Sequence, residues 1–440
     1  MREKTSRRTC STARRPATSE SAEPMTDPGP DLRIALYSGI FVHHDAVSNS
    51  LQSKLDILES LDARGARIDL NVFTQASDYR APYIRGVPTV AELLRQEAFW
   101  STDVHIFEFG MSYELFDSVF VIPPDRPIMV VEHNTTPPEL VDDPAVKLGC
   151  EAALLQRHNI SKAYRVACVS EFNLDLDRSI GVAEDRLRVL HLPPAHRLSP
   201  ADRKGFGDTQ GPVRLLYLGR LVRAKGVGDL LKAVSSLWGH GDDRFVLTLA
   251  GNPRFSDEAV VHQLERCTRR FAGLGKLQVV SSPSDEDIVE LFHSADVLVI
   301  PSYHEGYCVP VIEALSAGCY VIGSDAGNLP NVMGGLGRVV PAGDVPALTA
   351  AIADFVSRLR PSSDATLDTT STVRVPTDYG ELDYAAWLAV VAEHLEDYSD
   401  DAYERGFIRL LAELAAASPA GLSQRLGDLI SERTAELTRA

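Results

Sequence analysis

The stretch VRLLYLGRLVRAKG at residues 213–226 decides the fold that we expect for this chain. It begins with mostly large apolar residues, which are typical of a buried strand. Gly219 follows, then a short basic segment with Arg220 and Lys225, then Gly226 and an amphipathic run that predicts a helix. Glycine permits a tight turn, so the stretch predicts the strand–turn–helix unit of an α/β domain.

The same alternation of strand and helix runs outward from this stretch in both directions. We expect strands at 32–38, 67–73, 103–109, 127–133, 165–170, 187–192, 213–218, 245–250, 277–281, 296–301, 319–323 and 338–340. Helices are expected at 48–63, 144–158, 227–238, 257–271, 284–293, 310–317 and 345–356. Continuously apolar strands indicate parallel sheets covered on both faces. We therefore predict two Rossmann-like doubly wound domains facing a central cleft, where ligands bind.

The length of 440 residues is too great for one hydrophobic core, which supports division into domains. We expect a disordered N-terminal extension at 1–30, an N-terminal domain at 31–197, a C-terminal domain at 198–360, a linker at 361–380, and C-terminal helices at 381–440 that pack across the domains. The extension is rich in Arg and Ser and has almost no large apolar residue. A start at Met25 would remove most of it, so residues 1–24 are left open as part of the native protein.

Composition excludes several classes of protein. The chain has 61 Asp and Glu residues against 44 Lys and Arg, a net charge of −17 that argues against a general nucleic-acid partner. Six cysteines without a C-x-x-C pair favour neither zinc nor disulfides, and thus a reducing cytoplasm. No apolar run approaches the ~20 residues of a membrane helix. Peripheral contact with the inner face of a membrane stays open.

The basic segment after the strand at 213–218 is suited to a diphosphate. A glycine turn at a helix amino end offers free N–H groups and a positive dipole. Arg220 can hold phosphate oxygens in a bidentate manner, and Lys225 adds a point charge. An ordinary turn with solvated bases is an equally good interpretation of this segment alone. Arg223 is expected to be a surface residue.

An acidic loop follows a later strand, in the stretch HEGYCVPVIEAL at residues 304–315. Pro310 suits the first position of a helix, which places Glu305 on the loop and Glu313 in the first helical turn. The two carboxylates could then reach opposite ends of an extended ligand. The alternatives are dipole compensation by Glu313, a solvated Glu305, or a glycosidase pair about 5–9 Å apart. A glycosidase would not explain the adjacent basic loop.

These motifs together resemble the donor domain of the family 4 retaining glycosyltransferases with the GT-B fold, of the bacterial type. The resemblance rests on Gly219-Arg220 to Lys225-Gly226, on Ala295-Asp296-Val297 to Pro301-Ser302, and on Glu305 followed after seven residues by Glu313. The segments HDAVSN at 44–49 and HNTTP at 133–137 are similar to acceptor-domain segments of the same family.

The resemblance implies a role for each motif residue. Arg220 and Lys225 would bind the diphosphate of a nucleotide-sugar and stabilise it as it leaves. Glu313 would bind the ribose, and Glu305 would hold hydroxyls of the transferred sugar. His133 would face the sugar or the acceptor from the first domain. Further donor-site residues are Gly219, Gly306, Tyr307, Cys308 and, beside the base, Pro283. Acceptor-side candidates are His44, Asp45, Asn49 and Asn134.

The implied enzyme is a hexosyltransferase that moves a sugar from a nucleotide-diphosphate sugar, with UDP or GDP expected, to an acceptor hydroxyl. That hydroxyl could belong to a glycan, a lipid-linked sugar or a small molecule, and the resemblance implies no metal and no cofactor. The Asp-x-Asp pairs at 175–177 and 285–287 resemble metal motifs but fall in or at the start of predicted helices. A sugar-nucleotide epimerase or sugar phosphorylase on the same fold, and a catalytically silent scaffold, remain alternatives.

Overall fold

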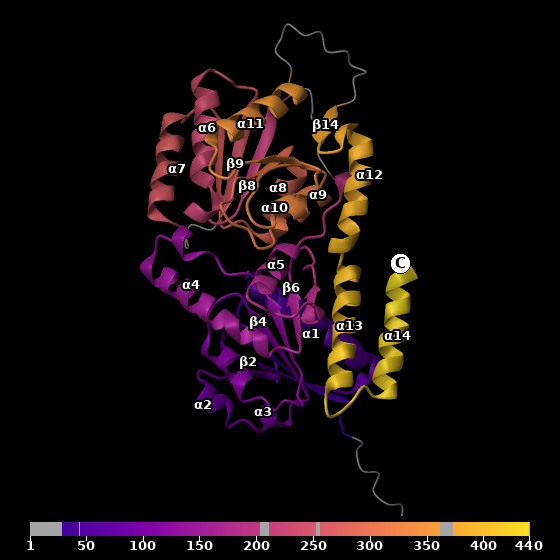
Figure 1. The fold of residues 1–440 in the computed structure, drawn as a ribbon. Coiled ribbons are helices and arrows are strands. Elements are labelled where there is room, and N and C mark those ends of the chain that lie inside the picture. Colours follow the sequence, from indigo (N-terminus) through magenta and orange to yellow (C-terminus); the bar gives the residue numbers. More distant parts are fainter. Residues whose placement is uncertain (1–28, 44, 203–210, 252–255, 361–372, 440) are drawn as a thin grey trace, which may run out of the picture.

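The computed structural model describes residues 29–43, 45–202, 211–251, 256–360 and 373–439. The predictions for the N-terminal extension, for a start at Met25 and for most of the linker at 361–380 fall outside these ranges. The described chain forms two α/β domains, one above the other in Figure 1, with the last helices running along one side of both.

The first domain is built on a parallel sheet with the strand order β3-β2-β1-β4-β5-β6-β7. Its strands are β1 Leu32–Phe41, β2 Ile68–Ser77, β3 Ile84–Gly86, β4 Val104–Phe109, β5 Ile128–Glu132, β6 Arg165–Cys168 and β7 Leu187–Val189. In the centre, Leu36 lies opposite Val72 on one side and Ile106 on the other. All three are fully buried, which agrees with the continuously apolar pattern of their strands.

The helices of this domain are α1 Ala46–Leu61, α2 Val90–Leu93, α3 Glu97–Ser101, α4 Pro144–Gln156 and α5 Glu171–Ser179. Two of them begin at residues that the sequence marks as helix starts. The Asp45 side chain caps α1 by accepting from the Ser48 amide at 2.8 Å. Asp143 caps α4 in the same way, with Pro144 at its first position.

The second domain repeats the plan with the strand order β10-β9-β8-β11-β12-β13. Its strands are β8 Val213–Leu218, β9 Phe245–Gly251, β10 Leu277–Ser281, β11 Val297–Ile300, β12 Tyr320–Ser324 and β13 Arg338–Val340. Its helices are α6 Val227–Gly239, α7 Glu258–Arg270, α8 Asp285–Ser294, α9 Val309–Ser316, α10 Leu329–Met333 and α11 Val345–Leu359. The predicted pair of Rossmann-like domains is confirmed.

Both sheets reverse their strand order at the first strand of the domain. The chain moves outward in one direction from β1 or β8, then returns to the other side of that strand with β4 or β11. Loops at the carboxyl ends of such neighbouring strands diverge and leave room for ligands. The basic segment after β8 and the acidic loop after β11 therefore lie at the same switch point.

The C-terminal segment differs from the expectation at its start. Residues 374–380, which we expected to be linker, belong to a hairpin of β14 (Arg374–Thr377) and β15 (Gly380–Asp383). Helices α12 (Tyr384–Leu395), α13 (Asp400–Ala417) and α14 (Gln424–Arg439) follow. In Figure 1, α12 runs beside the second domain and α13 beside the first.

Side-chain contacts fix these helices on the two domains. On α12, the Tyr384 hydroxyl donates to the Gly318 carbonyl at 2.8 Å in the second domain. On α13, Glu413 pairs with Arg165 of β6 at 2.5 Å in the first domain. The chain thus crosses between the domains twice, once after β7 and once between α12 and α13. The two crossings touch, because the ring of His191 stacks on that of Tyr398 at 4.5 Å.

Candidate active site between the two domains

The basic segment after β8 is folded tightly against β9 and β11. The Gly219 amide donates to the Ala250 carbonyl at 3.0 Å, so the chain turns directly at the end of the strand. Gly226 has φ 65°, and a Cβ there would lie 1.8 Å from the Pro301 carbonyl oxygen. Only glycine tolerates both conditions, so Gly226 sets the path that places Lys225 beside the segment after β11.

Lys225 reaches the acidic loop directly. Its Nζ lies 2.7 Å from Glu305 Oε2, while Glu305 Oε1 accepts from the Ser302 hydroxyl at 2.7 Å. The Glu305 side chain is 8% exposed and that of Lys225 is 24% exposed. A carboxylate has about four lone-pair positions, so Glu305 keeps acceptor capacity for a ligand hydroxyl.

Glu313 occupies a different position in its helix from the predicted one. It is the fifth residue of α9, beyond the first turn, and is buried. Dipole compensation at a first turn therefore does not explain it. Its Oε1 accepts from the backbone amide of His196 at 3.2 Å and from the His196 Nδ1 at 2.6 Å.

His196 is a site residue that the sequence reading missed. It lies in the segment that joins the domains, and its Nε2 is 3.5 Å from Asp285 at the start of α8. The hydrogen bond to Glu313 raises the pKa of His196, and Asp285 adds to this effect against desolvation. No motif surrounds this histidine, and its partner is 117 residues away, so the sequence contains no signal for the contact.

The electrostatics of two buried groups show that the basic and acidic residues share one region. Burial raises the pKa of the Cys308 thiol, Glu305 raises it further, and Lys225 opposes the rise. Burial likewise raises the pKa of the Tyr217 phenol, with Glu305 adding to the rise and Arg220 opposing it. Arg220 itself is exposed, so its guanidinium is accessible to an anion.

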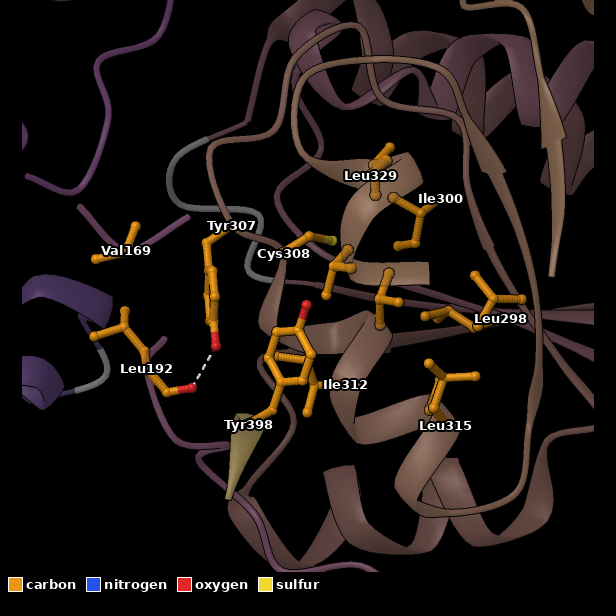
Figure 2. Close-up of a cluster of buried hydrophobic side chains, with 14 of the residues drawn as sticks. Val169, Leu192, Leu298, Ile300, Tyr307, Cys308, Ile312, Leu315, Leu329 and Tyr398 are labelled. Atoms are coloured by element: carbon orange, nitrogen blue, oxygen red, sulfur yellow. Dashed lines mark hydrogen bonds between the residues drawn. The ribbon is translucent and has the colours of Figure 1, made fainter. Parts of the chain in front are cut away.

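The loop between Glu305 and α9 presents backbone rather than side chains. The Tyr307 ring is buried and its hydroxyl donates to the Leu192 carbonyl at 2.5 Å, as Figure 2 shows. Cys308 is also buried and has a left-handed backbone with φ 75°. The contribution of these two positions to a ligand site would therefore come from main-chain atoms. Pro283, expected beside a base, follows β10 and is half-buried.

The first domain contacts this loop through Asn134 and Ser170. The Ser170 hydroxyl donates to the Gly306 carbonyl at 2.6 Å. Asn134 has φ 77°, and its Oδ1 accepts from His304 Nε2 at 2.7 Å. A Cβ on Gly306 would lie 2.4 Å from the Cβ of Asn134, so glycine lets the domains approach here.

Asn134 stands over a buried charged cluster. Its backbone amide donates to Glu132 Oε2 at 3.1 Å. The Arg157 guanidinium lies 2.9 Å from the Asp177 carboxylate and 3.5 Å from that of Glu132. Burial raises the pKa of Glu132 to about 8, Asp177 adds to the rise, and Arg157 opposes it. The surroundings therefore favour the protonated form of Glu132.

His133 is the other candidate from the first domain, and it is held by a buried acid. Its Nε2 lies 2.6 Å from Glu108 Oε2, and the Glu108 side chain has no exposed surface. Asp45 uses its carboxylate to cap α1, as described above, and Asn49 is an exposed residue of the same helix. His44 lies outside the described residues.

Arg223 and the two Asp-x-Asp pairs have partners that the sequence did not predict. Arg223 is more than a surface residue: it pairs with Asp142 of the first domain at 3.0 Å and donates to the Glu139 carbonyl. The Asp-x-Asp pairs have local partners. Asp177 binds Arg157, and Asp287 accepts from the backbone amide of Ser284 in a capping box.

Comparison with known proteins finds a family model that matches the second domain. The family model described as "Glycosyl transferases group 1" matches residues 199–363. This match confirms the predicted resemblance to a glycosyltransferase family. None of the described helices is both long and apolar enough to cross a membrane.

Two curated relatives carry names of the same kind. O-antigen chain mannosyltransferase B of Escherichia coli is 34% identical over 31% of this chain and 35% of its own length. MMP alpha-(1->4)-mannosyltransferase of Mycolicibacterium hassiacum is 32% identical over 40% of this chain and 41% of its own length. The chain thus matches well under half the length of these relatives.

A solved structure extends the similarity to both domains. Sucrose-phosphate synthase from Thermosynechococcus elongatus covers 88% of this chain and 100% of its own, with a TM-score of 0.61 and 19% identity. At that identity the similarity concerns the fold, and it confirms the GT-B architecture of two facing Rossmann-like domains.

Proposed function

We propose that this chain, whose residues 199–363 match the family model of the group 1 glycosyl transferases, transfers a sugar from a nucleotide-diphosphate sugar to an acceptor hydroxyl. The observation that supports the proposal most is the ion pair between Lys225 and Glu305. It joins a loop suited to phosphate with a loop suited to sugar hydroxyls, so one extended ligand can contact both.

The charge distribution suits departure of a diphosphate. When the anomeric carbon–oxygen bond breaks, negative charge grows on the leaving phosphate and positive character grows on the sugar ring. In this scheme the exposed guanidinium of Arg220 and the ammonium of Lys225 would stabilise the phosphate without reorganisation. Glu305, nearby and buried, would orient the sugar through its hydroxyls. The base would lie near Pro283, with the ribose at Glu313.

We propose retention of the anomeric configuration, with attack from the face that the diphosphate leaves. The acceptor oxygen bonds to the anomeric carbon, and its proton passes to the departing phosphate oxygen. No side chain needs to form a covalent intermediate in this scheme. Comparison of donor and product anomers by proton NMR tests it, and a product of inverted configuration would contradict it.

The donor is proposed to be a UDP- or GDP-sugar, and the acceptor a saccharide, a lipid-linked sugar or a small molecule. The names of the two relatives are consistent with a mannosyl donor and a saccharide acceptor. We propose that no metal or cofactor takes part. Activity that survives prolonged chelation with EDTA would support this, and loss of activity that Mg²⁺ or Mn²⁺ restores would contradict it.

A thermal-shift panel of UDP-, GDP-, ADP- and TDP-sugars tests the proposal at its first step. A ligand at one hundred times its dissociation constant stabilises the fold by roughly 2.7 kcal/mol. The Lys225→Ala and Glu313→Ala variants should each lose this stabilisation and about a hundredfold in turnover. Lys232→Ala is the matched control, because Lys232 is an exposed lysine of α6 that pairs only with Asp229 among the described residues. Wild-type behaviour of both site variants would defeat the assignment.

A further inference from the structure

A lysine and a glutamate form a wholly buried ion pair in the first domain, behind His133. Lys54 on α1 and Glu108 on β4 have no exposed side-chain surface, and their charged atoms are 2.9 Å apart. Neither residue belongs to a motif of the donor site. Burying two charges is unfavourable unless further hydrogen bonds compensate, so such a pair needs an explanation beyond packing.

The surroundings of Lys54 keep both groups ionised. Its Nζ donates to the Ser50 hydroxyl at 2.6 Å and the Ser50 carbonyl at 3.2 Å, and it faces the ring of Tyr403 at 5.8 Å. Burial alone would lower the pKa of Lys54, but Glu108 and Tyr403 outweigh it and the pKa is raised. Burial alone would raise the pKa of Glu108, but Lys54 and His133 lower it.

The second oxygen of Glu108 faces His133 at 2.6 Å. Because an ionised carboxylate only accepts hydrogen bonds, the nitrogen that meets it, Nε2, carries the proton. The other ring nitrogen, Nδ1, then has a free lone pair in the neutral imidazole. It makes no hydrogen bond to any residue that the structure describes.

His133 lies at the edge of the first domain that faces the donor loops. It directly follows β5, and the next residue, Asn134, contacts His304 and Gly306 of the second domain. His133 is therefore next to the residue that meets those loops, and 5% of its side chain is exposed. A hydrogen-bond acceptor at this position suits a sugar hydroxyl, which can donate to it.

We propose that Lys54 and Glu108 are positioning residues that hold His133 in its Nε2-protonated tautomer, so that Nδ1 accepts a hydrogen bond from a sugar hydroxyl. This inference rests on the proposed function, because it assumes a sugar between the domains. Lys54 fixes Glu108, Glu108 fixes His133, and His133 contacts the substrate. The hydroxyl belongs either to the donor sugar or to the acceptor.

The test combines a spectrum with kinetics. The paired substitution Lys54→Met with Glu108→Gln removes both charges together and avoids an unpaired buried ion. Nitrogen-15 NMR of the histidine rings should show His133 as the Nε2–H tautomer in wild-type protein and a tautomer mixture in the paired variant. Turnover should fall roughly tenfold, within the range for residues of one hydrogen-bond network, while UDP or GDP binding stays unchanged.

Three further variants separate positioning from stability. Arg126→Met with Asp103→Asn neutralises an ion pair at the opposite end of β4 and should leave turnover and the His133 tautomer unchanged. Adding His133→Ala to the paired variant should cost no more turnover than His133→Ala alone. Glu108→Asp keeps the charge and should retain the wild-type tautomer. If the paired variant does not fold, the spectrum of wild-type protein still tests the inference, because a His133 ring protonated on Nδ1 would overturn it.

The kinetic constants identify the source of the hydroxyl. A rise in KM for the nucleotide-sugar assigns it to the donor, and a rise in KM for the acceptor assigns it to the acceptor. An unchanged tautomer in the paired variant, or additive losses with His133→Ala, would overturn the inference. Wild-type protein without transfer activity would overturn the proposed function, whereas the tautomer measurement needs no substrate and would still report the link between Glu108 and His133.

Discussion

Lys225 and Glu305 are 80 residues apart in the chain, yet their charged atoms lie 2.7 Å from each other. The contact exists because β8 and β11 are neighbours at the switch point of the second sheet. Each residue follows one of these strands, so the parallel topology brings the two loops together. Substitution of the glycines next to these two residues, Gly226 and Gly306, tests how the backbone holds the loops in place.

Gly226→Ala should destabilise the second domain strongly. The residue has φ 65°, and a Cβ would lie 1.8 Å from the carbonyl oxygen of Pro301. Strain and overlap together should lower the free energy of unfolding by about 3 kcal/mol or more, measured by urea denaturation. Gly86→Ala is the control, because a Cβ there meets no atom within 4 Å. Equal effects of the two substitutions would contradict the tight fit at Gly226.

Gly306→Ala should separate the domains at their contact. Its Cβ would approach that of Asn134 to 2.4 Å, and the first domain would have to shift. Because a displacement of reacting groups by a fraction of an ångström is enough to slow catalysis, turnover should fall about tenfold or more. Asn134→Gly in the same protein removes the opposing Cβ and should restore the melting temperature. A melting temperature that stays low in the double variant would show that the overlap lies elsewhere.

His196 should make stability depend on pH. Its pKa is raised by the hydrogen bond to Glu313 and by Asp285, so the protonated form is favoured in the folded state. The stabilisation is therefore fully present below the pKa of histidine in the unfolded state, which is about 6.5. It disappears as the pH rises through the higher pKa of His196 in the folded state. Urea titrations from pH 5.5 to 8.5 should show the loss caused by His196→Ala to be greatest at the acidic end.

His262→Ala serves as the control for this pH dependence. His262 is an exposed histidine of α7 whose charge partner, Glu258, is 3.9 Å away. Its substitution should change stability equally little across the range. A pH-independent loss in His196→Ala would mean that the contact with Glu313 does not involve the imidazolium form.

Glu132→Gln should stabilise the first domain at alkaline pH. Burial and Asp177 raise the pKa of Glu132 to about 8, so the folded state binds a proton that the unfolded state releases near pH 4.5. Wild-type stability therefore falls as pH rises between these values. Glutamine retains the acceptor for the Asn134 amide without the charge, and should raise the free energy of unfolding at pH 8 by about 1 kcal/mol or more.

The gain from Glu132→Gln should shrink towards pH 5, where Glu132 is protonated in the folded state. Glu151→Gln, on the exposed surface of α4, is the matched control and should have little effect at either pH. If Glu132→Gln stabilised the protein more at pH 5 than at pH 8, the pKa of Glu132 would not be raised in the folded state.

The strands and the two loops of the candidate site could be predicted because their signals are local. A run such as Val213–Leu218 is apolar except for Arg214, and the structure gives the same bounds for β8. Each loop follows such a run, so its place at the carboxyl edge of the sheet follows from topology. The hairpin at β14–β15 was missed because its short strands include polar residues and pair only with each other among the described strands.

The contacts that connect distant segments had no signal in the sequence. In the sequence, Lys54 looks like any other polar residue of an amphipathic helix, although in the structure it is buried against Glu108. His196 meets Glu313 only because the joining segment folds back onto α9. The error for Glu313 has a simpler cause. Helix α9 begins at Val309, one residue before the predicted start at Pro310. Glu313 is four positions after Val309 and therefore lies beyond the first turn.

The stacking of His191 on Tyr398 joins the two places where the chain passes from one half of the molecule to the other. Because the two connections touch, a substitution at either ring acts on both of them at once.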